Sequence, residues 1–320
     1  MWRSVENGSD PVLRAPVLLA IVGPTATGKS AMAIDLAARL GGEVVACDST
    51  AVYRGIDIGT DKVSLEEQRG IAHHLVDMVD ATETYSAARY AADAAAAVHD
   101  IYRRGKVPIL AGGTGFYYRA LVRGLFPGPA RDEILRQRLN RVATRRGVEA
   151  LHRWLQGIDP ESAARIQPRD QKRLVRALEV YVLTGRPLTA HFAATVSPLA
   201  GWTIRTFGLN VPRDTLRARV TARVEQQFER GVVDEVRRLI ASGVPATAHA
   251  FSGLVYRQVI EMLHGVRNEA DTRALIVQEN MRYAKRQLTW FRRGQCIRWS
   301  SADAIESISG VCGFSRPPQP

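Results

Sequence analysis

The row GPTATGKS, residues Gly23 to Ser30, is the feature that most restricts how this chain can fold. It satisfies the pattern G-x-x-x-x-G-K-[ST] and stands between an apolar run, Val17 to Val22, and the helically spaced residues AMAIDLAARL. A strand, a glycine-rich loop and a helix in this order form a phosphate-binding site. Phosphate oxygens there are surrounded by backbone N–H groups, by the helix N-terminus and by the lysine. The sequence therefore predicts a phosphate-bearing ligand at the end of the first strand of an α/β domain.

Every residue of this phosphate-binding loop (P-loop) has an expected part in the site. Glycines let the backbone amides turn toward phosphate oxygens, Lys29 neutralises the outer phosphate, and the Ser30 hydroxyl can ligate Mg²⁺. We expect all eight residues to bind a diphosphate: Gly23, Pro24, Thr25, Ala26, Thr27, Gly28, Lys29 and Ser30. ATP is the default ligand, but the chain has no convincing NKxD pattern and no apolar strand ending in Asp-Glu, which weakens the GTPase and motor-ATPase interpretations.

Other apolar runs predict further strands of the same sheet. They are Glu43 to Asp48, His74 to Val79, Pro108 to Ala111 and Trp202 to Val211. A helix is expected before Pro108, since Ser86 can cap its N-terminus and Gly105 can end it. Long helices are expected from about Asp214 to Ser242 and from Asp271 to Arg293. Strands that alternate with helices favour a mainly parallel, doubly wound sheet with its ligands at the carboxyl ends of the strands.

The stretch 126–200 has a different character. It opens with FPGPARD, continues in helical segments without strand patterns, and holds 13 Arg and Lys against 7 Asp and Glu, half of the net charge of +12. We expect a helical insertion there, within a core made of 17–125 and 201–300. Residues 1–16 and 301–320 are expected to be a loosely ordered extension and tail.

The net charge and the pI of about 10.1 favour a polyanionic partner such as nucleic acid, although a basic pI can also be a general bias. In Arg282 to Arg298, six basic residues occur with Tyr283, Trp290 and Phe291 and with no acid. This pattern suits single-stranded RNA and, equally, an amphipathic helix with a solvated face. The three cysteines lack disulfide or zinc spacing, and no apolar run is long enough for a membrane span. We therefore expect a cytoplasmic protein with no membrane segment.

Polar residues follow two of the predicted strands. Asp48 ends the second strand, so its carboxylate should lie at the ligand-bearing edge near the P-loop, although Asp48 or Ser49 can instead cap a strand-end turn. The row GGTG, Gly112 to Gly115, follows another strand, and its Thr114 could hydrogen-bond a substrate. The pair His73–His74 lacks metal-ligand spacing and is interpreted as packing or turn residues.

Six blocks, in order along residues 17–300, resemble the tRNA dimethylallyltransferases, also called tRNA isopentenyltransferases. They are GPTATGKS, DSTAVYRGIDIGTDK, HHLVDMVDATETYSAARY, GGTGFYYRAL, RLVRALEVYVLTGRPLT and AKRQLTWFR. The resemblance implies a monomer with a P-loop NTPase-like α/β core, a mainly parallel sheet flanked by helices, and an α-helical insertion that grips the anticodon stem-loop of tRNA.

The activity implied by this resemblance is transfer of a dimethylallyl group from dimethylallyl diphosphate to N6 of the adenosine just 3′ of the anticodon, in tRNAs that read codons beginning with U. Asp48 matches the family's catalytic aspartate and would take a proton from the adenine amino group. Lys29, the loop amides and Mg²⁺ on Ser30 would stabilise the departing pyrophosphate. Arg223 falls at the position of an arginine that contacts the diphosphate, with Arg217 and Arg219 nearby at helical spacing.

The resemblance also implies contacts to tRNA. The matching residues are Asp48, Ser49, Thr50, Ala51, Thr114, Arg136, Lys172, Arg173, Leu174, Val175 and Arg176. One block departs from the usual pattern, because LVYRQ, Leu254 to Gln258, carries Val255 where the family has glycine. This departure concerns the local backbone near Tyr256 rather than the chemistry.

Two other functions fit parts of the sequence. A small-molecule kinase would use ATP at Gly23 to Ser30 and Asp48 to activate an acceptor hydroxyl. It would have no need of the basic insertion or of the basic and aromatic stretch from Arg282 to Arg298. A noncatalytic RNA-binding NTPase switch would leave Asp48 without a task.

Overall fold

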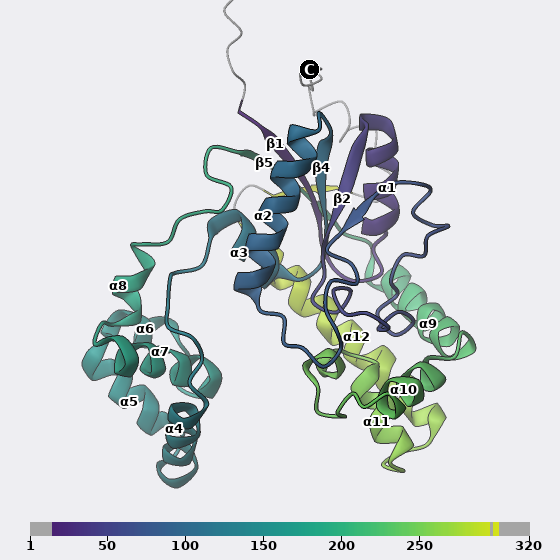
Figure 1. The fold of residues 1–320 in the computed structure, drawn as a ribbon. Helices are drawn as coiled ribbons and strands as arrows, with labels where there is room; N and C mark the ends of the chain where they lie inside the picture. Colours follow the sequence, from purple (N-terminus) through teal and green to yellow (C-terminus); the bar gives the residue numbers. More distant parts are fainter. Residues whose placement is uncertain (1–14, 295–296, 301–320) are drawn as a thin grey trace, which may run out of the picture. The chain divides into compact units, whose positions relative to one another are not determined.

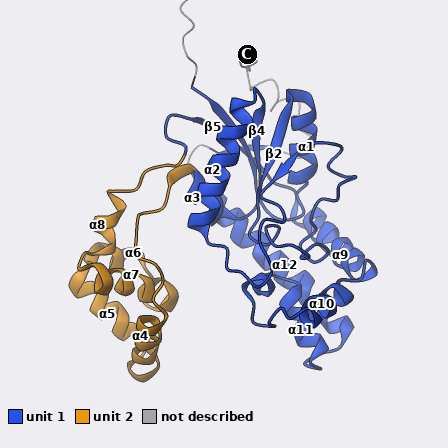
Figure 2. Ribbon diagram, viewed as in Figure 1, with its two compact units in different colours: residues 1–121, 199–320 blue, residues 122–198 orange. Residues whose placement is uncertain are grey.

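The computed structural model describes residues 15–294 and 297–300. The expected tail, most of the expected N-terminal extension, Cys296 and Cys312 lie outside these residues. The chain divides into two compact units: unit 1 comprises the residues up to 121 and from 199 onward, and unit 2 comprises residues 122–198 (Figure 2). No helix in the described part of the chain is both long and apolar enough to cross a membrane.

Unit 1 is built on one six-stranded sheet in which every pair of neighbouring strands is parallel (Figure 1). In spatial order the strands are β3 (His73–His74), β2 (Gly42–Cys47), β4 (Val107–Gly112), β1 (Val17–Val22), β5 (Thr203–Leu209) and β6 (Ile297–Ser300). The predicted parallel α/β fold of the core is therefore confirmed.

The three central strands β2, β4 and β1 end at the same level. Gly112 of β4 lies opposite Val22 of β1 on one side and opposite Cys47 of β2 on the other. The segments that follow are the P-loop, the row GGTG and the loop that begins at Asp48. Since parallel strands present their carboxyl ends at one edge, the register brings these three loops together.

The sheet is buried on both faces, as the continuously apolar strands predict. Alternate residues of β1 point to opposite sides: Leu18 packs in the cluster that holds Tyr90 and Tyr117, whereas Leu19 packs against Leu36. These partners come from α2 (Ala87–Arg103) and α3 (Gly115–Arg123) on one face and from α1 (Lys29–Leu40) on the other.

The remaining helices of unit 1 follow β5. They are α9 (Arg213–Glu229), α10 (Val232–Ala241), the 3₁₀ helix η1 (His249–Ser252), α11 (Tyr256–Leu263) and α12 (Glu269–Arg292). Helices α9 and α12 pack against the P-loop, because Leu216 and Val220 of α9 share a small buried cluster with Ala26 and with Ala284 of α12.

Unit 2 contains helices and loops but no strand, and the structure describes all of its residues. It consists of α4 (Glu133–Arg146), α5 (Val148–Ile158), α6 (Pro160–Arg165), α7 (Gln171–Thr184) and α8 (Leu188–Phe192). Its own apolar core is formed by residues such as Leu139, Leu151, Leu155, Leu174 and Leu178. This separate core explains how the segment can fold as an insertion.

Some predicted elements differ from the structure. The strand expected from His74 to Val79 is wrong beyond its first residue, because Leu75 and Asp77 have positive φ angles of 63° and 55° that an extended strand does not allow. The long helix expected from Asp214 to Ser242 is divided at Gly231, where φ is 86°. In contrast, the Ser86 cap is confirmed, since its hydroxyl accepts from the Arg89 amide at 3.1 Å.

Candidate active site

The loops that follow β1, β2 and β4 border one cavity of about 680 Å³ in unit 1. Lys29 and Ser30 reach it from the P-loop, Asp48 from the end of β2, and Arg223 from α9. The sequence predictions placed these residues in one site, and the structure brings them together. Their individual roles stay predictions.

The P-loop owes its shape to its glycines. Gly23 has a φ of 141°, and a Cβ atom there would lie 2.5 Å from the carbonyl oxygen of Leu209, so any other residue would force the loop away from β5. Gly28, with a φ of 91°, precedes the first turn of α1, whose N-terminus has no side-chain cap. The amides of this turn are therefore available to an anion, as at other helix N-termini that bind phosphate.

Lys29 is half-buried, lines this cavity and donates to the carbonyl oxygen of Pro24 within its own loop. Burial lowers the pKa of Lys29 to about 8, and the Arg223 guanidinium acts in the same direction, while the Asp48 carboxylate opposes them. Lys29 therefore loses its charge at a lower pH than an ordinary lysine. A bound anion would favour its protonated form.

Arg223 reaches the P-loop from α9. Its Nη1 lies 3.2 Å from the hydroxyl oxygen of Thr25, and its Nε lies 3.3 Å from Oδ2 of Asp61. Of the two alternatives on the same helix, Arg219 makes a long contact of 3.5 Å to the Ala26 carbonyl and Arg217 is exposed. Arg223 lines the cavity, and its contact with a diphosphate stays a prediction.

Asp61 is a site residue that the sequence predictions missed. It lines the cavity and accepts from Nε2 of Gln227 at 2.8 Å besides pairing with Arg223. Burial raises the pKa of Asp61 to about 6, although Arg223 lowers it. The sequence feature that could have identified Asp61 as a site residue is its position, thirteen residues after Asp48 in the same glycine-containing loop.

The Asp48 carboxylate is fixed by its own turn. Its Oδ1 accepts from the Thr50 amide at 2.8 Å, from the Thr50 hydroxyl at 2.7 Å and from the Ala51 amide at 3.3 Å. These bonds all end on Oδ1 rather than on Oδ2. Asp48 therefore does both things considered for it: it caps a strand-end turn and it lines the ligand cavity.

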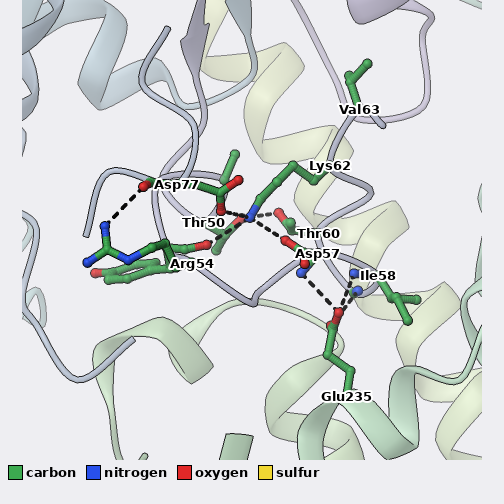
Figure 3. A network of polar contacts seen from close by, with 12 residues as sticks. Thr50, Arg54, Asp57, Ile58, Thr60, Lys62, Val63, Asp77 and Glu235 are labelled. Atoms are coloured by element: carbon green, nitrogen blue, oxygen red, sulfur yellow. Dashed lines mark hydrogen bonds and ion pairs between the residues drawn. The ribbon is translucent and has the colours of Figure 1, made fainter. Parts of the chain in front are cut away.

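The loop after Asp48 is held from below by Glu235 of α10 (Figure 3). The buried Glu235 carboxylate accepts from the backbone amides of Asp57, Ile58 and Gly59 at 3.1, 2.8 and 3.3 Å. Tyr256 donates to the same carboxylate at 2.6 Å. A buried carboxylate with four donors is well satisfied, so it fixes the path of this loop.

Lys62 holds the same loop from its other side (Figure 3). Its ammonium donates to the Tyr53 carbonyl at 2.8 Å and pairs with Asp57 at 2.5 Å and Asp77 at 2.6 Å. The Lys62 side chain is only 8% exposed. Lys62 also lines the cavity, but its ammonium is already engaged by three partners.

Gln287 of α12 joins two of the loops at the cavity. Its Oε1 accepts from the Thr25 amide at 2.8 Å, and its Nε2 donates to the Gly113 carbonyl at 2.9 Å.

Tyr283, one turn earlier on α12, also lines the cavity. Burial together with the nearby Asp48 carboxylate raises the pKa of the Tyr283 hydroxyl to about 12.

The residues of unit 2 that were predicted to contact tRNA differ in exposure. Arg136 and Arg176 both pair with the fully buried carboxylate of Glu179, at 2.8 and 2.6 Å. Leu174 and Val175 have buried side chains within the apolar core of the unit, whereas Lys172 and Arg173 are exposed. Lys172 and Arg173 can therefore contact RNA through their side chains, whereas Leu174 and Val175 cannot.

A basic groove on α4 was not singled out by the sequence predictions. It is a cavity of about 390 Å³ lined by Arg138, Arg141, Val142, Arg145 and Arg146. Arg138, Arg141 and Arg145 recur every three or four residues, and Arg146 lies four residues after Val142, so all of them share one side of the helix. This spacing of arginines within the basic stretch 126–200 is the sequence feature that could have predicted the basic groove.

The remaining predicted residues have the following positions. Ser49 donates its amide to Thr114 Oγ1 at 3.2 Å, which ties the Asp48 loop to the row GGTG. His74 bonds to the buried Glu43 at 2.7 Å, and His73 donates to the Ile71 carbonyl, in keeping with packing roles. Val255 is buried with φ 79° and ψ −64°, a conformation that suits glycine and strains a β-branched residue.

Comparison with known proteins decides the family. A family model described as IPP transferase matches residues 51–294. The chain belongs to the IPP transferase family. It is 46% identical over 288 residues to a tRNA dimethylallyltransferase of Thermomicrobium roseum, and the match covers 89% of this chain and 86% of that protein. The resemblance carried by the six sequence blocks is confirmed.

Solved structures agree. The chain is similar to the full-length tRNA isopentenylpyrophosphate transferase of Bacillus halodurans, with a TM-score of 0.68 and 37% identity over 92% of this chain and 93% of the other. It is also similar to a eukaryotic dimethylallyltransferase solved acting on tRNA, with a TM-score of 0.75 and 25% identity over 95% of this chain and 82% of the other.

Proposed function

We propose that this IPP transferase moves a dimethylallyl group from dimethylallyl diphosphate to N6 of the adenosine just 3′ of the anticodon in tRNAs reading codons that begin with U, and releases pyrophosphate. One observation carries the assignment of roles: Lys29 and Asp48 line the same cavity from the ends of β1 and β2, the two strands that flank β4. An anion-binding cation and a carboxylate base are the two groups that this reaction requires, since charge leaves on the diphosphate and a proton leaves the amine.

The diphosphate of the donor would occupy the P-loop. The amides at the start of α1, the Lys29 ammonium and the Arg223 guanidinium all carry positive charge toward that position. As the allylic C–O bond breaks, negative charge grows on the leaving pyrophosphate, and these groups stabilise it. The hydrocarbon tail would lie against apolar residues of the same cavity, which include Val44, Ala46, Val63, Val76 and Ala111.

The residues present fit a magnesium ion held largely by substrate. Ser30 is exposed at the cavity and offers a hydroxyl oxygen, a ligand type suited to Mg²⁺. Among the described residues, no group of three or more His, Cys, Asp or Glu side chains could hold a metal by itself. A Mg²⁺ ion bound through Ser30 and diphosphate oxygens would neutralise part of the leaving-group charge.

Asp48 would act as the general base. The adenine amino group is a weak nucleophile because its lone pair is delocalised into the ring, so loss of a proton must accompany formation of the C–N bond. Asp48 has one oxygen engaged by Thr50 and Ala51 and the other to accept that proton. The adenine must be turned out of the anticodon loop to reach this carboxylate.

The RNA would be held by exposed cations. Unit 2 supplies Lys172, Arg173 and the basic groove of α4, which can contact phosphates without distinguishing sequence. The backbone of the Asp48 loop and Thr114 would meet the adenosine itself. We expect the protein to act as a monomer in the cytoplasm, where its tRNA substrate is found.

The test is a single-turnover assay with an unmodified anticodon stem-loop and radiolabelled dimethylallyl diphosphate in the presence of Mg²⁺. Transfer of label to the adenosine 3′ of the anticodon is expected. A parallel reaction supplies labelled ATP and a panel of small alcohols. Absence of prenyl transfer together with phosphorylation or ATP hydrolysis would overturn the proposal in favour of the small-molecule kinase.

A further inference from the structure

Gln287 forms a bridge between two loops that come from different strands. The side chain is only 7% exposed, and both ends of its amide are satisfied by backbone: Oε1 by the Thr25 N–H at 2.8 Å and Nε2 by the Gly113 carbonyl at 2.9 Å. Thr25 belongs to the P-loop after β1, and Gly113 to the row GGTG after β4. A buried side chain that spans two loops in this way fixes the separation between them.

The bridge is made possible by the absence of a side chain at residue 113. A Cβ atom on Gly113 would lie 2.3 Å from Nε2 of Gln287 and 3.2 Å from the Gly23 carbonyl oxygen. The amide of Gln287 occupies this space. Gly113 and Gln287 are therefore complementary, although 174 residues separate them in the sequence.

The bridge continues to the loop of Asp48. Thr114, directly after Gly113, donates its amide to the Cys47 carbonyl at 3.1 Å and accepts from the Ser49 amide at 3.2 Å. These two residues flank Asp48. An unbroken series of hydrogen bonds thus runs from Thr25 in the P-loop, through Gln287 and Thr114, to the segment that carries the carboxylate.

This bridge also removes one amide from the phosphate cradle. The Thr25 N–H is directed to Gln287, so it does not face a diphosphate, which leaves the later loop amides, Lys29 and Arg223 for that task. Gln287 consequently contributes to the position of the cradle rather than to its affinity. Misplacement of reacting groups by about 1 Å can lower a rate by roughly 100-fold without a comparable loss of binding.

We infer that Gln287 is a positioning residue that sets the distance between the P-loop, which holds the donor, and the Asp48 loop, which receives the acceptor. The inference rests on the proposed prenyl transfer and deepens it. Its signature is a loss of turnover with little change in the apparent affinity for the donor.

The experiment uses the full chain with Gln287→Met, which keeps the volume and removes both hydrogen bonds. The matched control is Gln278→Met, an exposed glutamine on the same helix. Steady-state transfer to an anticodon stem-loop gives kcat and the donor KM, and thermal unfolding shows that each variant is folded at the assay temperature. Exchange of the Thr25 amide with deuterium, resolved to the single residue, reports the bridge without any substrate.

We expect Gln287→Met to lower kcat about tenfold or more, to change the donor KM less than about threefold, and to lose protection of the Thr25 amide, with the control unchanged. A second variant, Gly113→Ala, should give the same pattern. Wild-type kcat in a folded Gln287→Met protein would overturn the inference, as would a rise in KM that accounts for the whole loss. If the wild type transfers no prenyl group, the proposed function fails, and unchanged Thr25 protection in Gln287→Met would still refute the bridge by itself.

Discussion

Arg223 Nη1 lies 3.2 Å from the hydroxyl oxygen of Thr25, so a helix that follows the fifth strand reaches the phosphate-binding loop after the first. The two residues are 198 positions apart. Because Asp61 holds Nε of the same guanidinium at 3.3 Å, the planar cation is oriented from two sides before any ligand arrives.

Arg223→Ala should weaken the site for the donor more than a neighbouring substitution does. The variant removes a cation beside the diphosphate, so we expect the donor KM to rise at least about tenfold and kcat to fall as well. Arg217→Ala on the same helix changes an exposed arginine and should leave both within about twofold. Steady-state kinetics with varied donor measures this, and equal effects of the two variants would remove Arg223 from the site.

Donor binding should weaken as the pH rises above about 8. The pKa of Lys29 is about 8 in the free protein, and the diphosphate raises it by favouring the charged form. Between the two pKa values the complex therefore holds one more proton than the free protein, so affinity falls by up to about tenfold per pH unit. Titration of donor binding from pH 7 to 9.5 measures the slope.

A Lys29→Arg variant is the control for this pH dependence, because the guanidinium stays charged throughout the range. It should bind the donor more weakly than the wild type but without the decline above pH 8. Affinity of the wild-type protein that stays constant up to pH 9.5 would show that Lys29 does not meet the diphosphate.

Glu179→Gln should destabilise unit 2. Burial alone would raise the pKa of Glu179, but hydrogen bonds from Arg136, Arg176 and the Asp132 amide lower it to about 2. Removing the carboxylate leaves two half-buried guanidinium groups without their partner, at a cost of roughly 3 kcal/mol in the free energy of unfolding. Urea unfolding compares this variant with Glu149→Gln, which removes a more exposed ion pair with Arg169 and should be nearly silent.

The pH dependence of this contribution follows from the sign of the shift. Since the pKa of Glu179 is lower in the folded than in the unfolded chain, its stabilisation is fully present above about pH 4.5 and is lost as the pH falls toward 2. The difference in unfolding free energy between wild type and Glu179→Gln should therefore shrink below pH 4.5. A difference that is constant down to pH 3 would contradict the buried ion pairs.

Val255→Gly should be far less damaging than an ordinary core truncation. Relief of the strained backbone, about 1–3 kcal/mol, offsets the lost burial of the side chain, about 1.5–3 kcal/mol, so the net change should stay within about 2 kcal/mol. Val259→Gly, within helix α11 that Val255 precedes, has no strain to relieve and should cost roughly 3 kcal/mol or more. Urea unfolding measures both, and similar losses would show that Val255 is not strained.

Sequence patterns predicted the parts of the fold that depend on local periodicity. The apolar run before Gly23 predicted β1 with its observed bounds, and Ser86 predicted the start of α2. They failed after His74, where positive φ angles at Leu75 and Asp77 end the expected strand. The amides of residues 77–79 instead donate to the carbonyl oxygens of Ala51 and Val52, which are distant in the sequence.

The candidate site was accessible from sequence where chemistry follows a strand directly, as with Lys29 and Asp48. Asp61 and Gln287 were missed as site residues because their partners are distant in the chain: Asp61 pairs with Arg223, and Gln287 bonds to Thr25, 262 residues earlier. In the same way, the sequence shows that residues 136 and 176 are arginines but not that both form ion pairs with the buried Glu179 carboxylate. Tertiary pairing, rather than residue type, decides which charges face a ligand.

The central claim is that Asp48 takes the proton from the adenine amino group, and the most direct measurement is the single-turnover rate of Asp48→Ala with the donor and an anticodon stem-loop. A parallel titration gives the affinity of the variant for the donor. We expect the rate to fall about 100-fold or more while donor affinity changes less than about threefold. An unchanged rate, or a loss of donor affinity as large as the loss of rate, would contradict the role of Asp48 as the base.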